Sequence, residues 1–142
     1  PFIPSSRGGV LGINIVHYIP GLLLPLLVLL GNIVILPVEN RIKRWYFNDA
    51  AQKLSARDTL IKIGIAGSYG KTSTKFILGT ILLEKWNTLV TPSSFNTPMG
   101  ITRLIREQLS AEHEVFVAEM GERYKGDIAE LCNLIKPGYG II

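Results

Sequence analysis

The sequence predicts an α/β fold: a parallel sheet with flanking helices and a P-loop, incomplete within this chain and preceded by a transmembrane helix. Three observations predict this class. After Leu60, short β-branched runs alternate with segments of helical spacing, which is the pattern of a parallel sheet. A glycine-rich turn carrying Gly70-Lys71-Thr72 follows the first run. Finally, no Asp, Glu, Lys or Arg occurs from Gly8 to Val38.

Residues 1–39 are predicted to form a membrane-spanning segment. The stretch Ile13 to Val38 exceeds the roughly 20 apolar residues that a helix needs to cross a bilayer. Arg41, Lys43 and Arg44 follow it at once, so the positive-inside bias places this end in the cytoplasm. We therefore expect a protein of the cytoplasmic membrane, with the residues that follow the basic cluster on the cytoplasmic side. A buried core helix is the alternative interpretation.

Residues 40–58 are predicted to form a basic amphipathic juxtamembrane linker. This segment mixes basic side chains with Trp45, Tyr46 and Phe47. Aromatic residues commonly lie at the headgroup level of a bilayer. This favours a helix lying at the membrane interface. A solvated connector helix is the alternative.

Composition excludes several classes of protein. The charged residues make up 18% and the hydrophobic ones 47% of the chain, which excludes intrinsic disorder. The single Cys excludes a disulfide framework and a multi-cysteine zinc site. The whole net charge of +4 lies in residues 1–57, so the rest of the chain has no basic surface for nucleic acid, and we expect no nucleic-acid partner.

Residues 59–142 are predicted to form the α/β part, with its elements in alternating order. The expected strands are 60–66, 88–91, 115–118 and 139–142, and the expected helices are 73–85, 101–109 and 127–135, with a loop over 93–100. In the first of these helices, helical spacing relates Phe76, Ile77, Thr80, Ile81 and Leu82.

The glycine-rich turn predicts a phosphate-binding loop between the first strand and the first helix. Glycines let the backbone approach phosphates closely, and amides at a helix N-terminus favour an anion. Lys71 would contact the β- and γ-phosphates and Thr72 would bind Mg²⁺. The P-loop pattern has a glycine where this chain has Ile65. The predicted nucleotide contacts are Gly67, Ser68, Tyr69, Gly70, Lys71, Thr72 and Ser73.

Glu119 is the second candidate for the metal site. It ends the run Val115 to Ala118, at the carboxyl edge of a predicted strand, where open α/β sheets bind their ligands. A carboxylate there would complete the Mg²⁺ site that Thr72 begins. The alternative is a glutamate that faces solvent.

Three segments together resemble the Mur ligase family, with a spacing closest to its MurF branch. They are residues 67–73 (GSYGKTS), 91–100 (TPSSFNTPMG) and 119–128 (EMGERYKGDI). The resemblance implies that 59–142 is the N-terminal part of a central ATP-binding domain. It also implies catalytic roles for Lys71 and Glu119, Mg²⁺ binding by Thr72 and Glu119, and a substrate-lining loop with Thr91, Ser94 and Asn96.

The resemblance further implies ATP-dependent amide formation through an acyl phosphate, on a cell-wall precursor peptide. The family's UDP-sugar domain normally precedes the phosphate loop, but here a predicted membrane span stands before the loop, so that domain is either missing or lies upstream of the span. We therefore expect the bilayer as a partner, and a precursor that is either soluble and UDP-linked or lipid-linked. Two other hypotheses are a membrane-anchored P-loop kinase acting on a lipid headgroup, and a non-catalytic nucleotide-binding module. We expect the chain to be a fragment, inactive by itself.

Overall fold

The computed structural model describes residues 7–92 and 95–142, and the chain divides into two compact units, Pro1–Ile42 and Lys43–Ile142. Helix α1 (Arg7–Ser55) passes from the first unit into the second. Each unit is described by itself below.

The first unit is the long apolar part of α1. Within Leu23–Ser55 the helix is long and apolar enough to cross a membrane, and none of its most apolar stretch is buried inside the chain. Leu24, Leu27 and Val34 are 64%, 63% and 70% exposed. The described residues thus provide no apolar cover for these side chains, unlike the core of a soluble domain.

The second unit contains a four-stranded parallel sheet. Its strands are β1 (Ile61–Ile65), β2 (Thr88–Val90), β3 (Val115–Glu119) and β4 (Tyr139–Ile141), in the order β2-β3-β1-β4. All three pairings are parallel. The predicted α/β class is confirmed.

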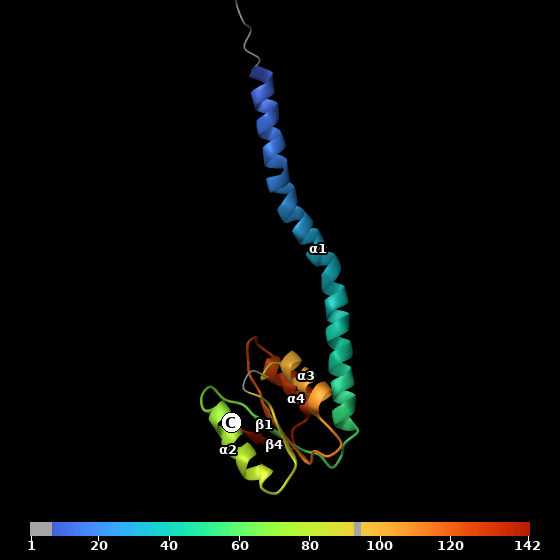
Figure 1. Ribbon diagram of the computed structural model, residues 1–142, viewed down its shortest axis with the longest axis vertical. Coiled ribbons are helices and arrows are strands. Elements are labelled where there is room, and N and C mark those ends of the chain that lie inside the picture. Colours follow the sequence, from blue (N-terminus) through green and yellow to red (C-terminus); the bar gives the residue numbers. More distant parts are fainter. Residues whose placement is uncertain (1–6, 93–94) are drawn as a thin grey trace, which may run out of the picture. The chain divides into compact units, whose positions relative to one another are not determined.

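Helices cover both faces of this sheet. Figure 1 shows α2 (Lys71–Leu83) on one side and α3 (Pro98–Gln108) and α4 (Asp127–Ile135) on the other. Successive side chains of a strand point to opposite faces of the sheet. Because helices cover both faces, every residue of β3 is buried. Phe116 and Ala118 join the core beneath α3 and α4, whereas Val115 and Val117 join the core beneath α2.

Of the residues whose helical spacing predicted α2, only Leu82 packs on the sheet. Phe76, Ile77 and Ile81 are 52%, 63% and 62% exposed. The residues that meet the sheet lie on the stripe Lys75, Leu78, Gly79 and Leu82. Gly79 allows a close approach, because a Cβ there would lie 2.8 Å from Cγ2 of Val90.

Helix α3 begins at Pro98, three residues before the expected start. The Thr97 side chain caps it by accepting a hydrogen bond from the Gly100 amide at 3.2 Å, and proline suits the first helical position. Part of the predicted loop is therefore helix.

The last turns of α1 belong to the α/β unit. Ala50 and Leu54 are buried in the core beneath α3 and α4. The Lys53 ammonium donates to the carbonyls of Ile105 and Arg106 at 3.0 Å each, where α3 leaves backbone acceptors unpaired. From residue 43 onward, the segment predicted as a linker is therefore a helix that packs against the rest of the α/β unit.

Candidate functional site

The glycine-rich loop, residues 67–73, lies at the carboxyl end of β1. Gly67 and Gly70 have φ angles of 139° and 76°, which side chains other than glycine adopt only with strain. Gly70 is the N-cap of α2. The Lys71 ammonium donates to the Gly67 carbonyl at 2.6 Å, across the loop. The loop is therefore a tight backbone turn that ends at a helix N-terminus, a geometry suited to an anion.

The side chains of this loop are open to solvent. Ser68, Tyr69, Thr72 and Ser73 are exposed, and Tyr69 has 96% of its surface free. Lys71 is half-buried. A phosphate-bearing ligand can therefore reach the loop without any rearrangement of the core.

Sheet pairing brings Glu119 to the loop. β1 and β3 are neighbours, and Ile65 pairs with Glu119. The Thr72 hydroxyl lies 3.2 Å from Oε1 and 3.1 Å from Oε2 of that carboxylate, and donates to it. Glu119 is only 2% exposed. The alternative of a solvent-facing glutamate is wrong, and the two predicted metal-binding residues are adjacent.

The structure adds a residue that the sequence analysis missed. Lys75 is fully buried on the inner face of α2, and its Nζ lies 2.8 Å from Oε2 of Glu119. It follows Thr72 by three residues, so both occupy one helix face. The signal in the sequence was the stripe of Leu78, Gly79 and Leu82, which places Lys75 inward with them.

The ion pair decides the charge state of Glu119. Burial by itself raises the pKa of this carboxyl group, but the Lys75 ammonium, together with hydrogen bonds from Thr72 and Asn96, outweighs it and lowers the pKa below its usual value. Glu119 is therefore an ionised, acceptor-only carboxylate at neutral pH.

The predicted substrate-lining residues have three different locations. Thr91 is fully buried, and its hydroxyl accepts the Glu119 backbone amide at 2.9 Å. Asn96 is half-buried, and its side chain hydrogen-bonds the Glu119 side chain. The backbone carbonyl of Asn96 accepts a hydrogen bond from the Gly121 amide at 2.7 Å. Ser94 lies outside the described residues. The structure thus places Thr91 and Asn96 around Glu119, and their contact with substrate stays a prediction.

The donor set fits a magnesium ion that also binds phosphates. Mg²⁺ prefers oxygen ligands and is usually held by one or two carboxylates plus substrate oxygens. Thr72 and Glu119 supply a hydroxyl and a carboxylate side by side. No group of three or more His, Cys, Asp or Glu residues in the described part of the chain could hold a metal alone, so the ligand's own oxygens would complete such a site.

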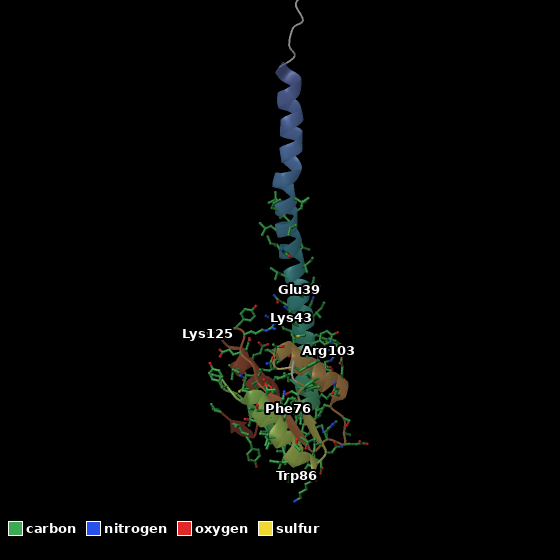
Figure 2. All side chains as sticks on the ribbon, turned by 60° about the vertical axis from the view of Figure 1, so that its left-hand side comes forward. Glu39, Lys43, Phe76, Trp86, Arg103 and Lys125 are labelled. Carbon is green, nitrogen blue, oxygen red and sulfur yellow. The ribbon has the colours of Figure 1, made fainter. Side chains whose placement is uncertain are left out.

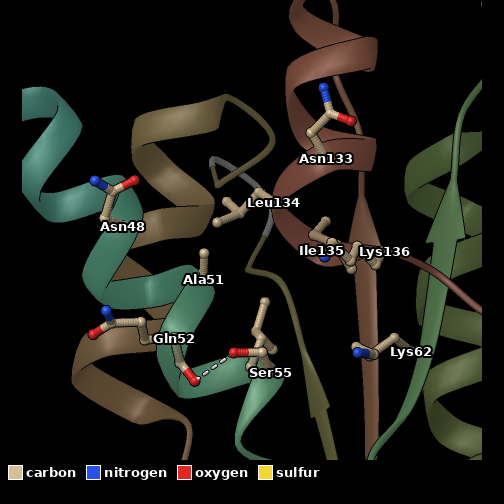
Figure 3. Close-up of a pocket in the computed structure, with 10 residues that line it drawn as sticks. Asn48, Ala51, Gln52, Ser55, Lys62, Asn133, Leu134, Ile135 and Lys136 are labelled. Atoms are coloured by element: carbon tan, nitrogen blue, oxygen red, sulfur yellow. Dashed lines mark hydrogen bonds between the residues drawn. The ribbon is translucent and has the colours of Figure 1, made fainter.

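A cavity of about 270 Å³ lies elsewhere, between the end of α1, β1 and α4 (Figure 3). Lys62 and Lys136, which line it, come near the amino ends of β1 and β4. The glycine-rich loop, by contrast, lies at the carboxyl end of β1, and Glu119 lies at the carboxyl end of β3. The cavity is therefore separate from the site and shares no residue with it.

Comparison with known proteins decides the family. Residues 65–142 match the family model of the Mur ligase middle domain. The chain belongs to the Mur ligase family. The match begins at the end of β1 and includes the glycine-rich loop, Glu119 and β4, so the Mur ligase residues and the site described here coincide.

The relatives are full-length Mur ligases. The UDP-N-acetylmuramoyl-tripeptide–D-alanyl-D-alanine ligase of Synechocystis sp. is 36% identical over 86 residues, which are 61% of this chain and 19% of that protein. The Escherichia coli enzyme of the same name is 31% identical over 80 residues, 56% of this chain and 18% of that protein. The chain thus spans about a fifth of the length of these relatives.

Solved structures agree with the sequence matches. MurF from Acinetobacter baumannii superimposes with a TM-score of 0.66 at 30% identity, over 69% of this chain and 21% of that one. MurF from Thermotoga maritima, solved in complex with ADP, gives a TM-score of 0.62 at 34% identity, over 67% of this chain and 22% of that one. These ligases give no support to the lipid kinase or to the non-catalytic module.

Proposed function

We propose that the protein is an ATP-dependent ligase of the MurF type, which forms an amide bond on a cell-wall precursor peptide. The observation that carries the proposal is the contact of Thr72 with Glu119, at 3.1 and 3.2 Å, beside the glycine-rich loop. The relatives named above are ligases of this activity, and the Thermotoga maritima structure holds ADP.

The reaction needs positioning and charge neutralisation more than covalent help from the protein. The γ-phosphoryl group of ATP passes to a substrate carboxylate and gives an acyl phosphate and ADP. An amine then attacks the acyl carbon, and phosphate leaves. Lys71 and the amides at the start of α2 would offset the charge of the ATP phosphates.

Magnesium fits the same arrangement. Thr72 and Glu119 would hold the ion, which when bound neutralises phosphate charge during transfer. Glu119 is suited to this because it is ionised and held by neighbouring groups. ATP and Mg²⁺ are therefore the proposed cofactors.

The experiment uses the full-length protein with ATP, Mg²⁺, D-alanyl-D-alanine and a UDP-muramoyl tripeptide. We expect an amide product by mass spectrometry and one phosphate released per amide. Glu119→Gln should abolish both, with Glu122→Gln, outside the proposed contacts, as the matched control. Phosphorylated lipid without amide, or nucleotide binding without turnover, would contradict the proposal.

We also propose that the apolar part of α1 spans the cytoplasmic membrane, with the α/β unit on the cytoplasmic side. The exposed apolar surface between Leu23 and Val38 supports a bilayer as its environment, and the positive-inside bias of Arg41, Lys43 and Arg44 supports the orientation. A precursor linked to a lipid carrier would then meet the site at the membrane.

Two measurements test this placement. The protein should sediment with membranes at high salt, and protease should cleave the α/β unit in inverted but not in right-side-out vesicles. Parallel assays with the UDP-linked and the lipid-linked precursor test the substrate form. A soluble protein that strongly prefers the UDP-linked precursor would contradict the membrane proposal and leave the ligase proposal intact.

A further inference from the structure

Lys75 is a lysine in an environment that lysines avoid. Its side chain has no exposed surface, and its Nζ lies 2.8 Å from Oε2 of Glu119. Burial of an unpaired ammonium group is strongly unfavourable. The partner therefore explains why the lysine is tolerated there, and any role of Lys75 is exerted through Glu119.

The surroundings of Lys75 hold it in place. Its ammonium lies 4.8 Å from the centroid of the Phe76 ring, which Figure 2 labels on α2. The helix face continues into Leu78 and Leu82, which pack on the sheet. The buried Lys75 ammonium contacts Glu119, whereas Lys71 contacts the Gly67 carbonyl across the loop. The two lysines of α2 thus have separate partners.

The Glu119 carboxylate is fixed from several sides. Lys75 contacts Oε2, the Thr72 hydroxyl contacts both oxygens, and Asn96 adds a further hydrogen bond. The Glu119 backbone amide is itself bonded to Thr91. Among these described partners Lys75 carries the charge that balances the carboxylate.

From this geometry we propose that Lys75 is a positioning residue, which orients and charge-balances the Glu119 carboxylate for the divalent cation. The inference rests on the proposed function, because it assumes that Glu119 binds the ion. Groups that orient metal ligands typically change metal affinity or activity about 10- to 100-fold when they are removed.

The test is Lys75→Met in the full-length protein, since methionine fills similar volume without charge. Mn²⁺ binding is measured by electron paramagnetic resonance in the presence of a non-hydrolysable ATP analogue, and analogue binding is measured without metal. We expect the Mn²⁺ dissociation constant to rise about 10- to 100-fold, with analogue binding in the absence of metal unchanged. Lys85→Met, at an exposed lysine just beyond α2, is the matched control and should change neither value.

Two further variants separate positioning from a general structural role. Lys75→Gln keeps a hydrogen-bond donor and should weaken Mn²⁺ binding less than Lys75→Met does; it also serves if the methionine variant fails to fold. In a Glu119→Gln background, Lys75→Met should produce no further loss. Unchanged or tighter Mn²⁺ binding in Lys75→Met, or an equal loss in both backgrounds, would overturn the inference. A wild-type protein that binds neither Mn²⁺ nor the analogue would instead contradict the proposed function.

Discussion

The Thr91 hydroxyl accepts a hydrogen bond from the backbone amide of Glu119 at 2.9 Å, and both residues are buried. β2 ends one residue earlier, at Val90, while β3 continues to Glu119. The threonine side chain thus takes the place of the backbone acceptor that β2 no longer supplies. Thr91, just after the end of β2, thus holds the backbone of Glu119, the proposed metal-binding residue at the end of the neighbouring strand β3.

Thr91→Val should lower the free energy of unfolding by about 1–3 kcal/mol, because a buried backbone donor loses its partner. Thr91→Ser keeps the hydroxyl and should recover most of the loss. Urea denaturation measures both. Thr80→Val, at an exposed threonine of α2, is the control and should stay within about 0.5 kcal/mol of wild type. A valine variant as stable as wild type, together with a larger loss in the serine variant, would show that the methyl group, rather than the hydrogen bond, matters.

Gly121→Ala should impair the site more than the fold. A Cβ at Gly121 would lie 2.8 Å from Cγ of Asn96 and 3.0 Å from its backbone carbonyl oxygen, so Asn96 must shift from the position in which it lies beside Glu119. We expect a loss of ligase activity of about 10- to 100-fold, measured as amide formation at saturating ATP. Gly140→Ala is the control, because a Cβ there has no neighbour within 4 Å. Wild-type activity in Gly121→Ala would show that the Asn96 contact is dispensable.

Most of the fold could be predicted from local sequence patterns. The strands and helices of the α/β unit follow from short β-branched runs and from turn residues such as Pro137 and Gly138. The pairing of Ile65 with Glu119 could not be predicted in this way, because register between distant strands depends on the packing of the whole sheet. For that reason Glu119 remained open to two interpretations until the structure placed it beside Thr72.

The burial of individual residues could not be predicted from spacing and residue type alone. The apolar residues of α2 outnumber its buried positions, so helical spacing alone did not separate the exposed Phe76, Ile77 and Ile81 from Leu82, which packs on the sheet. Lysine is almost always at the surface, which concealed Lys75 among them. Among the aromatic residues after the apolar segment, Phe47 packs against the core of the α/β unit, and a membrane-interface location of Trp45 and Tyr46 stays a prediction.

Asp127 gives the turn before α4 a pH dependence. Its Oδ2 accepts the amides of Arg123 and Tyr124 at 2.9 and 3.0 Å, and the hydrogen bonds from Tyr124 and then Arg123 lower the pKa of Asp127. A lowered pKa means that the carboxylate stabilises the folded state above its unfolded pKa, and that this contribution disappears as the pH falls through the folded value. The difference in unfolding free energy between wild type and Asp127→Asn should therefore be constant near neutral pH and shrink in acid. A difference independent of pH would contradict this assignment.

Leu54 tests whether the end of α1 is part of the α/β unit or a connector. Leu54 is 1% exposed in the core beneath α3 and α4, so Leu54→Ala should lower the unfolding free energy of this unit by about 2–5 kcal/mol, through lost burial and the cavity left behind. Leu83→Ala is the matched control at a residue that is 58% exposed, and it should cost less than about 0.5 kcal/mol. Urea titration of both variants decides the question. Equal, small effects would mean that residues 43–55 are an independent connector, and a large effect at Leu54 alone would mean that they form part of the core of the α/β unit.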